Sequence, residues 1–536
     1  MITVIDRFEH LTKYDFEMAL ASMDEDALKF YANEMYWHSP IDKKAKPLVR
    51  IGKAVDLFQN LTSDCLRYNR TSSKFWTYKD GCWHDMGTDK VASIVQQFGD
   101  ALTSFGSNHE AYQEAFVTIG SQLGGVPKAV NDFCSLLKAS DIGAFMTSDL
   151  DQEDNLINLK NACFDLKNLR LLPQSPAYML SKQCNVDYDP EAKCPRWIQF
   201  VNEITVDENG NPQPDKVEYL QKLMGLCLTT NTDNQFFHIF YGATTRNGKT
   251  TLANVLTGIL GTYAAYIPAD TLDSKTKVQP NAPRTDLVAM AGARAVIVGE
   301  PQRDMKFDAS LIKQITGRSP IPVRRPYEGV WYMHCQCKLI LDSNYLPKVT
   351  DETLFTSSRI RIIPFERHFE TSEQDPQLQS KLEAEYSGIF NWMLEGLKKY
   401  NESIEANRGI TNELLPSIEC MKNYEDTYED EFRRIDKFVS VLLEENGIDT
   451  YTTDQNTNYN TILVRTLYHY YKGWCKDECY MPMGFTKFKE EIAKRFKGKG
   501  FHADTEATIL GQRRHSRNVL VGYVLKADAD YYYLLA

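Results

Sequence analysis

The stretch IFYGATTRNGKTTLANVLTGILG, residues 239–261, decides how the rest of the chain is interpreted. An apolar run ends at Tyr241, a turn of small and polar residues follows, and Gly248-Lys249-Thr250 opens a segment with apolar residues at helical spacing. In a phosphate-binding loop, backbone N–H groups and a helix N-terminus attract phosphate oxygens, a Lys neutralises them and a hydroxyl holds Mg²⁺. The stretch therefore predicts a site for a nucleoside triphosphate.

The spacing of this loop departs from the usual pattern. Four residues normally lie between its two glycines, whereas five lie between Gly242 and Gly248. A gap of four would put Ala243 at the first glycine position. We interpret the loop as longer by one residue, because its small residues still permit close backbone approach. The alternative is a Gly-Lys-Thr triplet on a surface turn. We expect ATP to be held by Gly242, Ala243, Thr244, Thr245, Arg246, Asn247, Gly248, Lys249, Thr250 and Thr251.

Composition sets wide bounds on the function. A chain of 536 residues predicts two to four domains, and 43% hydrophobic and 25% charged residues are typical of a soluble globular protein. We expect a cytoplasmic protein without membrane contact, because neither a long apolar run nor a secretory signal is visible. The net charge of −11 argues against a wholly basic nucleic-acid coat but permits a local basic patch. The 12 scattered cysteines favour reduced core residues over metal ligands.

Changes in pattern along the chain suggest four regions. Residues 1–205 are expected to form a mixed α+β domain that serves in oligomerisation, as a collar, or where DNA enters. Residues 206–400 alternate apolar runs with helical patterns, which predicts an α/β ATPase core. A helical connector and linker over residues 401–460 and a small basic, aromatic domain over residues 461–536 complete the chain. Within the first region, FWTYKDGCWHD (75–85) predicts a hairpin around an Asp-Gly turn.

An ATPase also needs an acid at the end of a neighbouring strand. In ARAVIVGEPQRD (293–304), an apolar run ends at Gly299-Glu300. Glu300 is the expected acid, which would hold the water shell of Mg²⁺ or polarise the attacking water. Many such enzymes carry two adjacent acids, but position 299 is Gly, and Asp304 is only a weak candidate for assisting. The alternative is a surface glutamate after a strand.

Two further strands supply a polar sensor and a cation. KLILDSNYLP (338–347) ends in Asn344, which would sense the γ-phosphate and orient the water unless it only forms a turn. SSRIRIIPF (357–365) contains Arg359, which we assign as the arginine that reaches the γ-phosphate of a neighbouring subunit. Arg361 has the same side-chain parity, so it remains an alternative.

These four elements, in this order, resemble the superfamily 3 helicases. More narrowly, they resemble the phage and plasmid primase-helicase family, whose viral members include the poxvirus-type primase-helicase. Further segments resemble parts of that family, namely residues 155–173, 186–200, 283–300, 312–344 and 467–492. The longer loop and Gly299 are the two departures.

The resemblance implies an AAA+-like core in a hexameric ring of a phage or other mobile element, in a bacterial host. The ring would hydrolyse ATP at subunit interfaces and draw single-stranded DNA through its pore, 3′ to 5′. Lys249, Glu300, Asn344 and Arg359 would be catalytic, with Thr250 and Glu300 as Mg²⁺ ligands. Other replication proteins are possible partners.

By the same resemblance, a hairpin projects into the pore and contacts DNA through Arg324, Arg325 and Tyr327, near Glu328. Cations track phosphates and a Tyr stacks on a base, which agrees with that role. The alternative is a solvated hairpin. Lys313, on the preceding helix pattern, would touch DNA or the nucleotide or merely be exposed.

Family members often carry a primase, whose metals need two acids on a strand. The acid-x-acid candidates lie at residues 24–26, 187–189 and 528–530, and none has an apolar strand context. We therefore predict a helicase without primase catalysis.

The C-terminal region is locally basic. TKFKEEIAKRF has helical spacing, and a GKG turn and two short strands follow, which fits the winged helix that the family resemblance implies. We expect contact with duplex DNA, possibly an origin, through Lys494, Lys497, Lys499, Arg513 and Arg514. The alternative is a solvated basic face on a packing domain.

Two other functions compete with the helicase. A nucleotide-dependent switch or loader would bind partners without unwinding, and an initiator would mainly recognise an origin. Failure to form rings or to respond to single strands would favour the switch, whereas strong sequence-specific duplex binding by the C-terminal region would favour the initiator.

Overall fold

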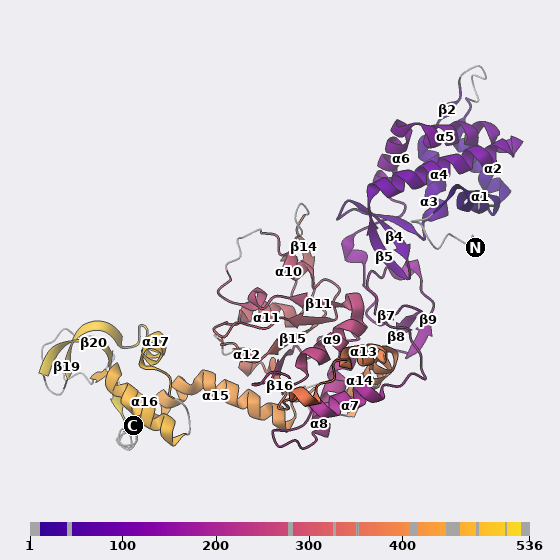
Figure 1. Cartoon of the computed structure of the whole chain (residues 1–536). Helices are drawn as coiled ribbons and strands as arrows, with labels where there is room; N and C mark the ends of the chain where they lie inside the picture. Colours follow the sequence, from indigo (N-terminus) through magenta and orange to yellow (C-terminus); the bar gives the residue numbers. More distant parts are fainter. Residues whose placement is uncertain are drawn as a thin grey trace. The chain divides into compact units, whose positions relative to one another are not determined.

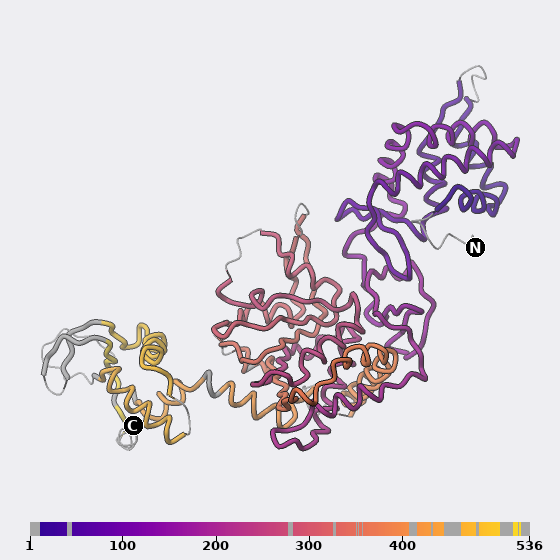
Figure 2. The backbone as a smooth tube through the Cα atoms, viewed as in Figure 1, coloured from indigo at the N-terminus to yellow at the C-terminus, as the bar shows by residue number. Residues whose placement is uncertain are grey.

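The computed structural model describes residues 11–39, 46–276, 282–324, 329–349, 351, 353–406, 415–445, 461–478, 482–509 and 512–526. The chain divides into two compact units, residues 1–422 and 423–536. Figure 1 shows the elements of each unit, and Figure 2 traces the backbone.

The first unit begins with a helical bundle that has its own core. Phe16, Phe58, Phe98 and Phe133 meet in this core as tilted and edge-to-face rings. The elements are α1 (Lys13–Ala21), α2 (Glu25–Met35), β1 (Tyr36–Trp37), β2 (Leu48–Val49), α3 (Ile51–Thr62), α4 (Thr88–Ser107), α5 (Gln113–Gly125) and α6 (Pro127–Ala139).

A small sheet contains the hairpin that the sequence predicts. Its strands are β3 (Leu66–Asn69), β4 (Lys74–Lys79), β5 (Cys82–Met86) and β6 (Ala144–Phe145), in the order β5-β4-β3-β6. Lys79 pairs with Cys82, and both turn residues have positive φ, 50° at Asp80 and 79° at Gly81. A type I′ turn requires positive φ at both positions, so the hairpin prediction is confirmed.

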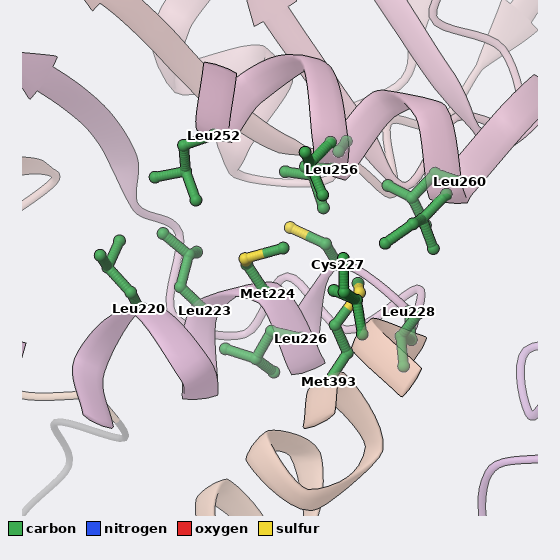
Figure 3. Close-up of a cluster of buried hydrophobic side chains, with 14 of the residues drawn as sticks. Leu220, Leu223, Met224, Leu226, Cys227, Leu228, Leu252, Leu256, Leu260 and Met393 are labelled. Carbon is green, nitrogen blue, oxygen red and sulfur yellow. The ribbon is translucent and has the colours of Figure 1, made fainter. Parts of the chain in front are cut away.

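The elements that follow pack beside the central sheet and α9 (Lys249–Leu260). They are β7 (Leu156–Asn158), β8 (Cys163–Asp165), β9 (Arg170–Leu172), α7 (Pro195–Ile204) and α8 (Pro214–Leu226). Both α7 and α8 contribute to the cluster that buries α9. Figure 3 shows this packing with the side chains Leu220, Leu223 and Met224 of α8 facing Leu252, Leu256 and Leu260 of α9. Hydrophobic packing thus continues across residue 205, where the sequence predicts a domain boundary.

A five-stranded parallel sheet forms the centre of the first unit. Its order is β11-β12-β15-β10-β16. The strands are β10 (Phe237–Tyr241), β11 (Ala264–Ile267), β12 (Ala295–Val298), β15 (Lys338–Ser343) and β16 (Ile360–Pro364). Strands β10, β12, β15 and β16 are almost fully buried, as apolar runs in a parallel sheet predict, whereas the edge strand β11 exposes Tyr266. The predicted α/β core is therefore present, and the carboxyl ends of β12, β15 and β10 are neighbours along one edge.

The remaining elements of this unit surround the sheet. They are α10 (Thr285–Val288), α11 (Ala309–Thr316), the hairpin β13 (Ile321–Val323) with β14 (Trp331–Met333), α12 (Thr353–Thr356), α13 (Leu378–Glu383) and α14 (Tyr386–Ala406). The antiparallel pairing of β13 and β14 agrees with the hairpin expected from the sequence.

Helix α14 and the turn before it contact helices α7 and α8. Glu385 accepts hydrogen bonds from the backbone N–H groups of Arg196 (3.1 Å) and Trp197 (2.9 Å), which satisfies free donors at the start of α7. Gly396 of α14 lies against α8 so closely that a Cβ there would be 2.0 Å from the carbonyl oxygen of Gln221.

The second unit packs helices against a small sheet. Its core joins Phe438 of α15 (Glu419–Leu442) with Tyr471, Trp474 and Phe488. The other elements are β17 (Leu443–Glu445), β18 (Thr461–Leu463), α16 (Val464–Asp477), α17 (Phe485–Arg495), β19 (Phe501–Ile509), β20 (Gln512–Val521) and β21 (Tyr523–Leu525). Strands β18, β20 and β19 form one sheet, and β17 pairs with β21.

None of the helices in the described ranges combines the length and the hydrophobicity that crossing a bilayer requires. No disulfide joins the described cysteines, most of which are buried.

Candidate nucleotide site

The loop between β10 and α9 folds around the side chain of Asn247. Its amide nitrogen donates to the carbonyl oxygen of Thr244 (2.6 Å), and the backbone is left-handed at Arg246 (φ 59°) and Gly248 (φ 85°). A Cβ on Gly242 would lie 2.0 Å from the Asn247 amide nitrogen and 3.0 Å from the carbonyl oxygen of Phe365, so a larger residue would have to displace the Asn247 side chain. This close packing agrees with Gly242 as the first glycine of a loop that is longer by one residue, and segment 243–246 is exposed.

Lys249 stands at the first turn of α9 with its ammonium group held in place. The residue is 3% exposed, and Nζ donates to Oδ1 of Asn247 (3.0 Å) and to Oδ1 of Asn344 (2.9 Å). Burial lowers the pKa of Lys249, while the nearby Asp342 and Glu300 carboxylates oppose that shift. A cation fixed at a helix N-terminus by neutral amides is available to the oxygens of a phosphate.

Asn344 joins two of the other predicted residues. Its Oδ1 accepts from Lys249, and its Nδ2 donates to Oε1 of Glu300 (2.8 Å). Glu300 is exposed at the end of β12 and Asn344 follows β15, so the contact arises because these parallel strands are neighbours. The structure thus brings Lys249, Asn344 and Glu300 into one hydrogen-bonded cluster, open to solvent on the Glu300 side.

A fourth member of the cluster, Asp342, was missed by the sequence analysis. Its Oδ2 accepts a hydrogen bond from Oγ1 of Thr250 (2.8 Å), and its Oδ1 lies 3.8 Å from Nζ of Lys249. Burial raises the pKa of Asp342, although the Thr250 hydroxyl and the Lys249 charge counteract this effect. The available signal was an acid inside an apolar run, two positions before Asn344, at the carboxyl end of the strand.

The donor set fits Mg²⁺ bound together with a phosphate. Thr250, Asp342 and Glu300 offer hydroxyl and carboxylate oxygens, the hard ligands that Mg²⁺ prefers. Among the described residues, no three His, Cys, Asp or Glu side chains gather as a self-sufficient metal site. A site with few protein ligands suits Mg²⁺, which keeps several waters and shares its coordination with substrate phosphates.

A cavity of about 310 Å³ lies beside the loop. Its apolar walls include Phe200, Phe369 and Leu378, and it reaches Gly248 and Thr251 at the start of α9. The segment after β16 is hydrogen-bonded to the loop, since the N–H of Phe369 donates to the carbonyl oxygen of Arg246 (2.9 Å). The volume is at the lower end of the range for small-molecule pockets, and its mixed lining suits a nucleotide base and ribose.

The two candidate arginines lie far from this cluster along their strand. Arg359 precedes β16, and because β16 runs parallel to β10 it belongs to the edge of the sheet opposite the phosphate loop. Its guanidinium donates to Oγ1 of Thr316 (2.8 Å). Arg361 is 3% exposed and lies over the ring of Phe236, with 4.0 Å from Cζ to the ring centroid. Arg361 is a packed residue in this chain, and Arg359 remains the predicted arginine for a neighbouring subunit.

Other predicted residues have partners outside the cluster. Asp304 forms an ion pair with Lys275, and Lys313 donates to Asp351 (2.8 Å). Arg324, half-buried, follows β13, while Arg325, Tyr327 and Glu328 lie outside the described residues.

In the second unit, Lys494 lies in the last turn of α17, and Lys497 and Lys499 follow in the next turn, all exposed. Arg513 and Arg514 belong to β20, but their side chains lie outside the described ones.

The acid-x-acid segments have no sheet context where they are described. Asp24 is the N-cap of α2 and accepts from the N–H of Ala27 (3.2 Å). Residues 187–189 lie in an irregular segment, and residues 528–530 fall outside the described ranges.

Comparison with known proteins finds one similar family model and several similar viral proteins. Residues 55–206 match the family model described as "D5 N terminal like". "Putative helicase L207/L206" of Acanthamoeba polyphaga mimivirus is 26% identical over 276 residues, which cover 47% of this chain and 28% of that protein. Residues 55–206 are thus similar to that family model, and the chain is similar to viral proteins named as putative helicases. "Putative helicase 121R" of Invertebrate iridescent virus 3 is 24% identical over 241 residues, 43% of this chain and 25% of that protein.

The chain spans only about a quarter of the length of these curated relatives. Among solved structures, the apo structure of the NrS-1 C-terminal region aligns with a TM-score of 0.43 and 10% identity, covering 87% of this chain and 98% of that chain. The relatives named here are viral, and the bacterial host expected from the sequence stays a prediction.

Proposed function

We propose that this chain is an ATP-dependent replicative DNA helicase of superfamily 3, with an AAA+-like core. The observation that carries the proposal is the hydrogen-bonded cluster of Lys249, Asn344 and Glu300 at the carboxyl edge of the parallel sheet. Ligands of open α/β sheets bind at this edge, and the cluster joins the loop to two neighbouring strands.

In this proposal, the loop residues 242–251 hold the phosphates of ATP, and the cavity beside Phe200 and Phe369 takes the base and ribose. When bound, Mg²⁺ would neutralise phosphate charge, held by the Thr250 hydroxyl and the Glu300 carboxylate. Glu300 orients and polarises the attacking water. The amide of Asn344 positions both side chains, because it accepts a hydrogen bond from Lys249 and donates one to Glu300.

The proposed assembly is a homo-hexameric ring. The Lys249 cluster lies at the carboxyl ends of the parallel strands and Arg359 lies at their amino ends, so Arg359 does not serve the site of its own chain. A head-to-tail ring would bring Arg359 to the γ-phosphate of the adjacent subunit, where it stabilises transition-state charge. The β13–β14 hairpin would contact single-stranded DNA that moves 3′ to 5′, and the expected contact residues are Arg324, Arg325 and Tyr327.

The second unit is proposed to be a winged helix that docks on duplex DNA, such as an origin. Support comes from α17 followed by the β19–β20 hairpin, with exposed Lys494, Lys497 and Lys499 at their junction. No primase activity is proposed, because the two described acid-x-acid segments lie on a helix start and in an irregular stretch.

Strand displacement on forked DNA tests this function. We expect ATP-dependent unwinding of a fork with a 3′ single-stranded tail, none on a matched fork with only a 5′ tail, and none with Lys249→Ala. Nucleotide hydrolysis that ignores DNA, with no unwinding of either fork, would reject the helicase and favour a nucleotide-dependent switch or loader.

A further inference from the structure

The position beside Glu300 lacks the acid that many related sites carry. Gly299 stands there, immediately after β12. The register of β12 with β15 sets Val298 beside Leu341, and continuing it by one residue sets Gly299 beside Asp342. The carboxylate absent from one strand is therefore present at the adjacent position of its neighbour, on the same face of the sheet.

The side chain of Asp342 is directed to the hydroxyl that the phosphate loop provides. Oδ2 accepts from Oγ1 of Thr250 at 2.8 Å. The direct hydrogen bond of Asp342 is to Thr250 and not to Lys249, because the ammonium donates to two amide oxygens and lies 3.8 Å from Oδ1 of Asp342. The side chain of Asp342 is only 22% exposed, so a carboxylate is kept largely out of water beside a single hydroxyl donor.

We propose that Asp342 supplies the second carboxylate of the Mg²⁺ site, in place of an acid at Gly299, by holding the Thr250 hydroxyl and the metal's water shell. This inference rests on the proposed function. Asp342 would act only through the metal, whereas Glu300 would also polarise the attacking water. A buried carboxylate next to a metal-binding hydroxyl gains a partner when the cation arrives.

The dependence of nucleotide affinity on Mg²⁺ tests the proposal without measuring turnover. A fluorescent ATP analogue is titrated into wild type and Asp342→Ser, each with Mg²⁺ and with EDTA. We expect the tightening by Mg²⁺ to shrink about 10- to 100-fold in the variant, the usual cost of losing a partner of a metal ligand. Affinity in EDTA should stay within about threefold, because a lost carboxylate does not weaken metal-free phosphate binding. Equal weakening under both conditions would mean that Asp342 only positions Thr250, and would overturn the proposal.

Moving the carboxylate back to β12 provides a rescue. A Cβ on Gly299 would meet only the carbonyl oxygen of Ile267, at 3.8 Å, so Asp fits there, one strand spacing of about 4.8 Å from position 342. Gly299→Asp in the Asp342→Ser background should restore most of the Mg²⁺ dependence, and Gly299→Ala in that background should restore none. Manganese titration followed by electron paramagnetic resonance should show the same order of metal affinities.

The outcomes separate this inference from the proposed function. If wild type binds no nucleotide, the proposed function fails and takes the inference with it. If wild type binds with Mg²⁺ dependence and Asp342→Ser retains that dependence in full, only the inference fails.

Discussion

Replacing Asn344 by Ala tests whether the amide between Lys249 and Glu300 takes part in the reaction. The change removes two hydrogen bonds, from Lys249 Nζ (2.9 Å) and to Glu300 Oε1 (2.8 Å). Hydrogen bonds to charged groups contribute about 1.5–3 kcal/mol each. Lys249 retains Asn247 as an acceptor and Glu300 is exposed to water, so the lower value applies to both bonds.

The sum is about 3 kcal/mol, which corresponds to about a 100-fold lower kcat if both bonds support the transition state. Nucleotide affinity should change much less, because the loop and Lys249 remain. The assay is steady-state ATP hydrolysis with single-stranded DNA at saturation, with nucleotide binding measured separately. Asn254→Ala, at an exposed position of α9, is the matched control. A loss in kcat below about fivefold, or a loss confined to KM, would refute this role of Asn344.

Three further predictions concern stability and DNA contact. Gly396→Ala should lower the free energy of unfolding of the first unit by about 3 kcal/mol, because the added Cβ meets the carbonyl oxygen of Gln221 and forces the helices apart. Burial and the Arg361 charge lower the pKa of His238 to about 3, so between about pH 6.5 and 3 the unfolded chain binds the proton more readily. Stability should then fall with falling pH, by about 1.4 kcal/mol per pH unit for this group, and His238→Phe should flatten that slope in thermal unfolding. Charge reversal at Lys497 and Lys499 together should weaken duplex binding and reduce its salt slope by about 2, if each contacts one phosphate.

The two stability predictions each have a control in the chain. Gly52→Ala, where a Cβ has open space in α3, should not destabilise. His84→Phe, at an exposed position, should leave the pH slope unchanged. The reasoning for Gly396 would be contradicted by an unfolding midpoint equal to that of wild type. Equal pH slopes for His238→Phe and wild type would contradict the reasoning for His238, and an unchanged salt slope would contradict the role of Lys497 and Lys499.

Local patterns were sufficient to predict the elements of the core. The apolar run at 295–298 is β12, and the Asp80-Gly81 turn has the positive φ values that its residue types favour. The helix after Gly248 begins and ends where the sequence indicates, with Gly261 as its C-cap. These features depend on neighbours in sequence, which is why they can be read from it.

Features that depend on strand order could not be predicted in the same way. Asp342 appears in the sequence as one charge in an apolar run. It contacts Thr250 because β15 lies between β12 and β10, and the sequence does not reveal that strand order. Arg361 shares the parity of Arg359, but its burial depends on Phe236, which is distant in sequence. The polar segment 206–216 predicts a break in the chain, yet composition does not reveal that the helices on both sides share one core with α9.

The measurement that decides whether this chain is a DNA-driven ATPase is ATP hydrolysis with and without single-stranded DNA. It is made on the intact chain and on Lys249→Ala. Lys249 is the buried cation of the proposed phosphate site. The account predicts hydrolysis that rises with DNA and disappears in the variant. Hydrolysis that is indifferent to DNA, or that persists in Lys249→Ala, would contradict it.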